Sequence, residues 1–200
     1  MKIIDITRTL QEAPLYHEDE PAKIEAIKAM EQGDECNVSR FTGCVHLGTH
    51  ADAFSHYQAD GTTIDNMPLE HYCGKCRVLT VPSDTLIKLS DIKGRIAGSE
   101  RIALRSGGSS YLCEQAAEYI AACGLKALLT DAISVAPSDN EASIHQLLNG
   151  GEVAVIENVV LDGVEDGDYL LFAFPVKYGG CDGAPVRAVL IDDYILWNKL

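Results

Sequence analysis

The sequence predicts a single α/β domain, residues 1–200, whose sheet-rich centre is a mixed β-sheet flanked by helices. Short apolar, β-branched segments recur along the whole chain. Segments with helical spacing alternate with them in the second half, whereas the first half is richer in strand and loop. No glycine-rich nucleotide motif is present, so a doubly wound nucleotide fold has no motif support. This pattern favours a mixed sheet over a purely parallel one.

Seven segments are predicted as strands, because each is short, apolar and bounded by Gly, Pro, Asp or Ser. They are residues 2–7, 77–81, 101–105, 126–130, 152–157, 168–174 and 186–191. Three further segments have helical spacing and end at a glycine. They are residues 21–33, 109–124 and 140–150. In the second of these, Ser109 or Ser110 is the expected N-terminal cap.

The overall charge restricts the partners that this chain can have. Thirty acidic residues against 16 basic ones give a net charge of −14, with no Lys/Arg cluster. Such a surface repels phosphate backbones, so nucleic acid is excluded as a partner. No apolar run reaches the roughly 20 residues of a membrane helix, and the N-terminus does not resemble a signal peptide. We therefore expect a cytoplasmic protein that acts on a small molecule.

The seven cysteines fit a reducing compartment, where thiols stay free. Cys73 and Cys76 form a C-x-x-C pair, which is one half of a redox or zinc motif. No second pair exists, and the segment runs directly into a predicted strand. Ordinary buried or turn cysteines are the better interpretation, since free Cys behaves mainly as a small apolar residue.

Four potential metal ligands or catalytic groups lie within eleven positions: His46, His50, Asp52 and His56. In one straight strand the outer two would be about 33 Å apart, too far to share an ion bound at about 2 Å. The chain must therefore turn, and Gly48 is the natural place.

Two imidazoles and a carboxylate suit Zn²⁺, Mn²⁺ or Fe²⁺ and leave coordination positions open for water and substrate. Open positions distinguish a catalytic site from a structural one. The alternative is that these histidines are unrelated and merely hydrogen-bonded near a turn. The density of ligand-type residues favours the metal site.

A second pair lies downstream, with His145 on a predicted helix and Glu157 at the end of an apolar strand. A glutamate that closes a buried strand is costly unless it is paired or binds a cation. The alternative is a strand-end side chain that reaches solvent.

At this point the residues resemble a known family. H-L-G-T-H-A-D-A-F-S-H is similar to the H-x-G-T-H-x-D-x-P-x-H signature of the cyclase family, which includes bacterial kynurenine formamidases and isatin hydrolases. The resemblance extends over most of the chain, through IDITRTL, PLYHEDEP, RIALRSG, TDAISVAPSD, SIHQLLNGGEVAVIEN and DGAPVRAVLI. It implies a swivelling β/β/α-like fold, assembled as a homodimer or homotetramer.

The resemblance also implies roles for individual residues. His46, His50 and Asp52 bind one ion, and His145 belongs to a second. Glu157, twelve positions after His145, joins Asp52 in bridging the two. The expected ions are Zn²⁺, with Mn²⁺ as the alternative.

Two further positions have implied roles. His56 is the implied catalytic histidine, and Tyr16 stands where formamidases carry a substrate-contacting tryptophan. Three departures bear on the substrate pocket: Phe54 replaces the motif proline, Ser55 replaces a frequent aromatic residue, and Tyr16-His17 replaces Trp-Pro.

The expected chemistry is hydrolysis of an amide, N-formyl (arylformamide) or lactam bond by metal-activated water, with His56 as proton shuttle. Two alternatives remain open. One is a cyclic amide or imide hydrolase similar to isatin hydrolase that uses one ion. The other is a non-catalytic module that binds a metal or a small molecule.

Overall fold

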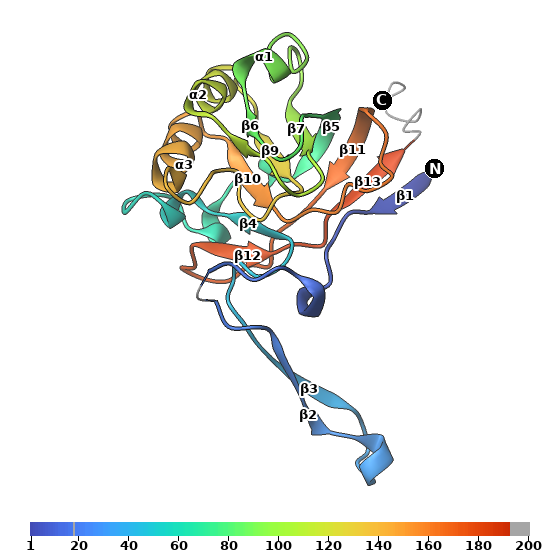
Figure 1. The fold of residues 1–200 in the computed structure, drawn as a ribbon. Helices are drawn as coiled ribbons and strands as arrows, with labels where there is room; N and C mark the ends of the chain where they lie inside the picture. Colours follow the sequence, from blue (N-terminus) through green and yellow to red (C-terminus); the bar gives the residue numbers. More distant parts are fainter. Residues whose placement is uncertain (18, 193–200) are drawn as a thin grey trace.

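A curled, mixed sheet of nine strands forms the centre of the computed structural model, which describes residues 1–17 and 19–192. Four neighbouring strands, β5, β7, β9 and β10, are parallel, and every other pairing in the sheet is antiparallel (Figure 1). This confirms the predicted mixed sheet. In order across the sheet the strands are β1 (Lys2–Asp5), β13 (Val189–Asp192), β11 (Gly167–Phe172), β5 (Cys73–Thr80), β7 (Arg101–Arg105), β9 (Ala127–Thr130), β10 (Ala154–Glu157), β4 (His50–Asp52) and β12 (Gly183–Pro185).

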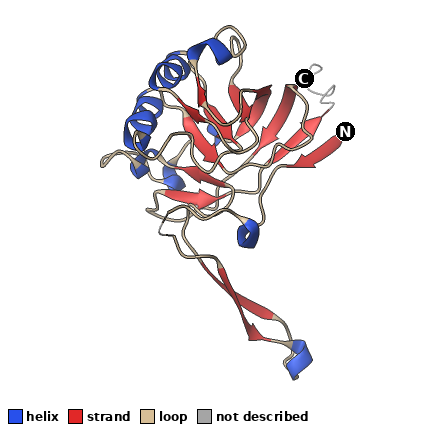
Figure 2. Cartoon of the chain, in the orientation of Figure 1, coloured by secondary structure: helices blue, strands red, loops and turns tan. Residues whose placement is uncertain are grey.

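Helices cover one face of this sheet (Figure 2). They are α1 (Leu89–Ile92), α2 (Glu114–Ala122) and α3 (Glu141–Gly150). Ile120 of α2 and Leu148 of α3 are fully buried against Leu104 and Leu128 of the sheet. Burying a side chain of this kind contributes about 1.5–3 kcal/mol, so this layer holds the helices in place.

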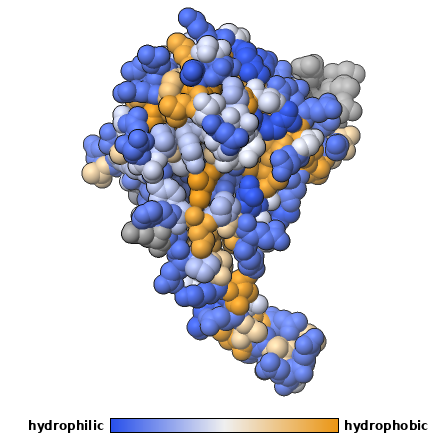
Figure 3. Space-filling model, viewed as in Figure 1, coloured by the Kyte–Doolittle hydropathy of each residue, from blue (hydrophilic) through white to orange (hydrophobic). Residues whose placement is uncertain are grey.

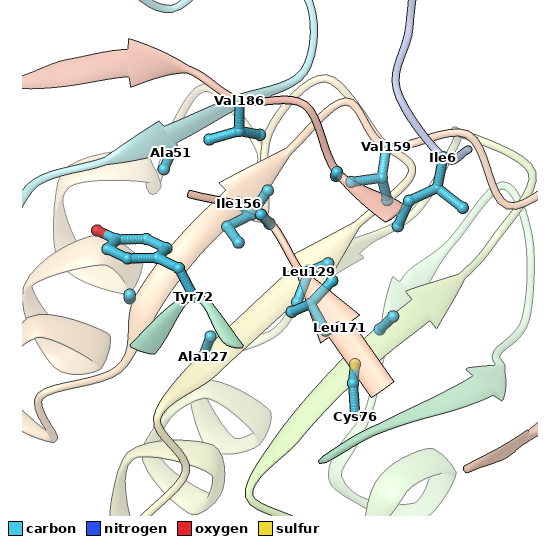
Figure 4. Packing of buried hydrophobic residues seen from close by; sticks show 14 of the residues in the cluster. Ile6, Ala51, Tyr72, Cys76, Ala127, Leu129, Ile156, Val159, Leu171 and Val186 are labelled. Carbon is cyan, nitrogen blue, oxygen red and sulfur yellow. The ribbon is translucent and has the colours of Figure 1, made fainter. Parts of the chain in front are cut away.

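The opposite face of the sheet packs on a second apolar cluster (Figure 4). Leu129 belongs to this cluster, whereas its neighbour Leu128 faces the helices, as the alternation of a strand requires. Ile156 and Leu171 join Leu129 there, and Ile6 packs in from the N-terminal segment. The central strands are thus buried on both faces, which explains their nearly continuous apolar sequences.

Short elements complete the body of the molecule. They are the 3₁₀ turns η1 (Leu10–Glu12), η3 (Phe54–His56), η4 (Ile64–Asn66) and η5 (Leu69–His71), and the small parallel pair β6 (Leu86–Ile87) and β8 (Tyr111–Leu112). Among the helices of the described chain, none has both the length and the apolar character needed to cross a bilayer.

A two-stranded hairpin projects from the body (Figure 1). It consists of β2 (Lys23–Lys28), the 3₁₀ turn η2 (Met30–Gln32) and β3 (Val38–Thr42). The helix predicted over residues 21–33 is therefore wrong. Apolar residues spaced by three fit a helix as well as a bulged strand, and in the described structure this segment has no core to bury a helical face. Gly33 does end a helical turn, with φ of +95°, but that turn is η2.

The predicted cap of the second helix is also wrong. Ser109 Oγ donates to the Ser106 carbonyl, and Ser110 Oγ donates to the Pro82 carbonyl. The chain then passes through β8 before α2 begins at Glu114. The predicted end holds, because Gly124 adopts φ of +69° just after the helix.

Candidate metal centre

The turn predicted at Gly48 exists and redirects the chain into β4. Gly48 has φ of +69°, and a Cβ there would lie 2.8 Å from Leu10 Cδ2. A side chain there would be strained by the backbone conformation and would have to displace the end of the Leu10 side chain. After this turn His50 and Asp52 face back toward His46, as the sequence predicts.

The pairing of β4 with its two neighbours brings in residues that are remote in sequence. On one side His50 lies opposite Glu157 of β10, and on the other Asp52 lies opposite Gly183 of β12. A Cβ at Gly183 would lie 2.6 Å from His46 Cε1. Glycine at this position therefore leaves the space that the His46 ring occupies.

Two main-chain carbonyls orient the imidazoles of this site. His50 Nδ1 lies 2.9 Å from the Gly48 carbonyl oxygen, and His145 Nδ1 lies 2.9 Å from the Glu141 carbonyl oxygen within α3. If each Nδ1 donates to its carbonyl, each Nε2 is left to face the carboxylates. This is how metal-binding histidines are commonly held.

The carboxylates of Asp52 and Glu157 lie between the imidazoles of His46 and His50 on one side and that of His145 on the other. Asp52 Oδ1 lies 2.9 Å from His46 Nδ1 and 3.3 Å from His50 Nε2, whereas Asp52 Oδ2 lies 3.5 Å from His145 Nε2. Glu157 Oε2 is 3.5 Å from His50 Nε2, and its Oε1 is 3.4 Å from His145 Nε2. Each carboxylate thus has one oxygen facing His50 and the other facing His145. We call these five residues the histidine–carboxylate cluster.

The cluster fits a divalent cation on observations of this structure. Asp52 and Glu157 are each 5% exposed, and Asp52 Oδ2 is a buried oxygen without a hydrogen-bond partner. Among the described residues, two triplets offer ligand atoms within 4.8 Å of one another. They are His46–Asp52–His56 and His50–Asp52–Glu157. These triplets differ from the predicted ligand sets, because the prediction assigns His46 and His50 to the same ion, whereas each triplet contains only one of them.

The pKa values of the imidazoles show that the buried carboxylates favour a positive charge beside them. Burial opposes a charged His50, but hydrogen bonds to Asp52 and Glu157 outweigh it and raise the pKa of His50 well above its ordinary value. The same balance raises the pKa of His145 to about 10. Two buried carboxylates therefore draw protons onto neighbouring rings, in the place where a bound cation would supply the charge.

His56 lies beside the cluster, on η3, and its ring stacks on His46 at a centroid distance of 4.0 Å. Asp182 Oδ2 lies 3.2 Å from His56 Nδ1 and 3.1 Å from His46 Nε2, so one carboxylate contacts both rings. Burial lowers the pKa of His56. Sequence reasoning missed Asp182, although it immediately precedes Gly183 in the DGAPVRAVLI segment.

A cavity of about 260 Å³ opens onto the histidine–carboxylate cluster and is lined by Tyr16, Tyr57 and Glu141, among others. Tyr16 Oη donates to Glu141 Oε2 at 2.6 Å, and this bond raises the pKa of Tyr16 to about 12. The Tyr57 ring stacks on His145 at 4.3 Å. Tyr57 and Glu141 were not predicted. Tyr57 follows the motif directly, and that position is the signal that could have found it.

Two cysteines singled out by the sequence, Cys73 and Cys76, lie outside the site, as do Asp131 and Arg187. Cys73 and Cys76 sit on β5 as free thiols, and burial raises the pKa of Cys76 to about 12. Asp131 accepts hydrogen bonds from the Ser106 and Gly107 amides and fixes the loop after β7. Arg187 pairs with Asp5 at the surface. Cys73 and Cys76 are therefore ordinary strand residues, as expected, and Asp131 has a structural role.

Comparisons with known proteins identify the family and the fold. Residues 4–137 match the family described as "Putative cyclase". A solved protein described as a potential metal-dependent hydrolase with cyclase activity is 26% identical, with a TM-score of 0.81 over 94% of this chain and 96% of that one. A predicted metal-dependent hydrolase from Bacillus stearothermophilus is 25% identical, with a TM-score of 0.81 over 94% and 97%. Isatin hydrolase A from Ralstonia solanacearum is 20% identical, with a TM-score of 0.82 over 96% and 92%, and shows a shared fold.

Proposed function

This chain belongs to the cyclase family, and from that premise we propose that it is a metal-dependent hydrolase of amide-type carbon–nitrogen bonds. Its substrate class is an N-formyl arylamine or another small amide, including lactams. The observation that carries the proposal is the pair of buried carboxylates, Asp52 and Glu157, each shared between two groups of imidazoles. A buried pair of negative charges with open space beside it is suited to cations that must also accept substrate.

In this proposal His46 and His50 would hold one ion and His145 would hold a second, and the carboxylates of Asp52 and Glu157 would serve both. Zn²⁺ is the first candidate and Mn²⁺ the alternative, because imidazole and carboxylate ligands accept several first-row ions. A bound ion would lower the pKa of its water to about 7 and polarise a carbonyl oxygen.

His56 moves the proton. With His56 Nδ1 facing Asp182, Nε2 is left to take a proton from the attacking water. Burial lowers the pKa of His56, which keeps the ring neutral and basic near pH 7. The same proton then passes to the leaving nitrogen as the carbon–nitrogen bond breaks. An N-formyl arylamine and water thus give formate and the free amine, and a lactam gives the ring-opened amino acid.

The cavity limits the size of the substrate. A volume of about 260 Å³ is close to the lower end of small-molecule sites. Tyr16 and Tyr57 offer aromatic faces at its rim, which favours a flat, aromatic acyl-amine. The likeness to isatin hydrolases supports the second candidate, a cyclic amide or imide, through the fold that the two share.

Two measurements test the proposal together. Elemental analysis should find divalent metal in the purified protein, and turnover should appear in a panel of formanilides, lactams and cyclic imides assayed with Zn²⁺ and Mn²⁺. Glu157→Gln should remove metal, whereas His71→Gln, a histidine outside the cluster, should not. Absence of metal uptake would contradict the proposal. Full metal occupancy without turnover on any substrate would point instead to a binding module.

A further inference from the structure

One residue that lines the cavity beside the histidine–carboxylate cluster, Asn158, has no role in the function proposed above. Hydrophilic residues cover most of the face of the molecule in Figure 3, where water supplies their hydrogen bonds. Asn158, in contrast, is only 2% exposed, and within the described chain its Oδ1 is a buried oxygen without a hydrogen-bond partner. A buried amide oxygen of this kind is costly unless another group supplies a donor.

The backbone of Asn158 is fixed on both sides. Its amide donates to the Ala132 carbonyl at 3.0 Å, and its own carbonyl accepts from Thr49 Oγ1 at 2.7 Å. Its φ is +59°, in the left-handed region, which asparagine adopts more readily than most residues but still at a cost. Such backbone persists where the surrounding structure holds it, and it is concentrated at binding and catalytic sites.

The same contacts relate Asn158 to the residues of the proposed metal centre. Glu157 precedes Asn158 directly, and Thr49 precedes His50. His50, Glu157 and Asn158 all line the same cavity, whose volume is about 260 Å³. Because this space is small, one molecule in it can contact both the histidine–carboxylate cluster and Asn158.

The partner that Asn158 Oδ1 lacks is a hydrogen-bond donor. Asp52 Oδ2 is also buried without a partner, but it belongs to a carboxylate, which a cation can satisfy. The Asn158 amide is neutral, and its oxygen only accepts hydrogen bonds. Tyr16 Oη, a donor in the cavity wall, already donates to Glu141. An N–H group of the molecule that occupies the cavity would complete Asn158.

We propose, on the basis of the proposed function, that Asn158 accepts a hydrogen bond from the N–H of the amide that is cleaved. Asn158 is then a specificity-determining residue, and the substrate class narrows to secondary amides, whose scissile nitrogen carries a hydrogen. Formanilides, lactams and cyclic imides with a free N–H belong to this class, whereas their N-alkyl derivatives do not.

This hydrogen bond also bears on the rate of bond cleavage. The leaving nitrogen keeps its original hydrogen and gains the proton that His56 delivers, so positive charge develops on it as the carbon–nitrogen bond breaks. A hydrogen bond from a more positive donor is stronger. The contact with Asn158 therefore strengthens toward the transition state and raises kcat as well as affinity.

Steady-state kinetics with ring-locked pairs tests the contact, because the two members of each pair differ only at nitrogen. The pairs are isatin and phthalimide, each beside its N-methyl derivative. For wild type, kcat/KM should be at least about tenfold higher for the N–H compounds. Asn158→Gly removes the side-chain amide and adopts the same φ without strain. It should abolish this preference by lowering kcat/KM for the N–H compounds and leaving that for the N-methyl compounds unchanged.

Two further variants separate the contact from a structural role. Glu152→Gly is the matched control, since Glu152 is exposed and has a φ of +54°, and it should keep the wild-type rates. Asn158→Asp retains an oxygen acceptor at the same place and should keep the preference for N–H compounds. If Asn158→Gly instead gains activity on the N-methyl compounds and keeps its rate on the N–H compounds, Asn158 only limits space and the inference is overturned.

Metal content supplies a separate check on Asn158→Gly. Elemental analysis should find the wild-type amount of divalent metal in this variant, because Asn158 Oδ1 contacts substrate. Loss of metal would make Oδ1 a metal ligand and would overturn the inference.

Equilibrium binding tests the contact independently of turnover. Titration calorimetry on metal-stripped wild type should show at least about tenfold tighter binding of each N–H compound than of its N-methyl derivative. Asn158→Gly should bind both members of a pair equally. Equal affinities in wild type, or no binding of either compound, would overturn the inference. Metal-loaded wild type that hydrolyses neither pair would contradict the proposed function instead, and the binding result would then decide the role of Asn158.

Discussion

At the scale of single residues, the site depends on side chains that hold other side chains. His46 is fixed by Asp52 on one nitrogen and Asp182 on the other. Gly183 leaves the space for its ring. Asp52 would itself bind an ion, whereas Asp182 and Gly183 position the His46 ring without belonging to the histidine–carboxylate cluster.

Gly183→Ala should weaken divalent metal binding at least about tenfold, because its Cβ would lie 2.6 Å from His46 Cε1 and displace the ring. Titration calorimetry of the metal-stripped protein measures this change. Gly179→Ala is the matched control, since no atom lies within 4 Å of its added Cβ. Equal affinity in both variants would show that His46 does not bind the metal.

His56→Ala should lower turnover about 10²–10⁴-fold, the usual contribution of a positioned acid or base. Bound metal, measured by elemental analysis, should stay near the wild-type value. Loss of bound metal from this variant would instead make His56 a ligand, as the triplet His46–Asp52–His56 also allows. Loss of metal with activity intact would contradict metal-dependent hydrolysis.

At the scale of elements, the strands fit together through a few buried contacts. Arg101 of β7 is 1% exposed and donates to the carbonyls of Glu70, His71 and Lys75. It ties the chain around η5 to the sheet. This arrangement requires glycine at position 74, where φ is +126° and a Cβ would lie 2.5 Å from Arg101 Nη1.

Gly74→Ala should therefore lower the free energy of unfolding by more than about 3 kcal/mol, through backbone strain and displacement of a buried charge. Gly98→Ala serves as comparison, because it has φ of +73° but no atom within 4 Å of the added Cβ. It should cost only about 1 kcal/mol. Urea unfolding measures both, and equal losses would show that the Arg101 contact contributes nothing.

The pair Arg77–Asp168 joins β5 to β11 at 2.7 Å. The hydrogen bond from Arg77 lowers the pKa of Asp168 below its ordinary value. A carboxylate with a lowered folded-state pKa stabilises the fold above its unfolded pKa of about 3.9, and this contribution disappears as the pH falls through the folded pKa.

Asp168→Asn should accordingly lower stability by about 0.5–1 kcal/mol at pH 7, since the pair is partly exposed. Its unfolding curve should converge with that of wild type as the pH falls through the lowered folded-state pKa of Asp168. Asp162→Asn, another exposed carboxylate, controls for the loss of one charge. A difference that persists at low pH would mean that charge is not the cause.

Local sequence predicts the buried strands of this protein well and the exposed hairpin poorly. The predicted segments 101–105 and 126–130 coincide with β7 and β9, because buried strands between loops carry a continuous apolar pattern. The helix predicted over residues 21–33 was wrong because the exposed β2–β3 hairpin buries neither face in the body. The spacing of its apolar residues therefore does not distinguish a strand from a helix. The motif located His46, His50 and Asp52, but Asp182 reaches them only through the pairing of β12 with β4, which local sequence cannot reveal.

At the scale of the whole molecule, a bound ion should stabilise the fold in proportion to its affinity. At a free metal concentration about 1,000 times Kd, the stabilisation is about 4 kcal/mol. For a chain of this length, about 1 kcal/mol shifts the midpoint of thermal unfolding by roughly 2–4 °C.

Removing the metal with a chelator should thus lower the unfolding temperature by about 8–16 °C, and added Zn²⁺ should restore it. Scanning calorimetry measures the shift. Glu157→Gln should respond much less to the chelator, because one bridging carboxylate is gone. A wild-type protein that is indifferent to the chelator would argue against a resident ion.

The contact between His46 and Asp182 spans 136 positions of the chain. During synthesis, the ribosome must release the chain through Pro185 before β12 can pair with β4. A nascent or prematurely ended chain would carry the complete histidine motif and yet lack the carboxylate that steadies two of its rings. Loading with metal in the cell should therefore wait until the chain through Asp182 has been synthesised.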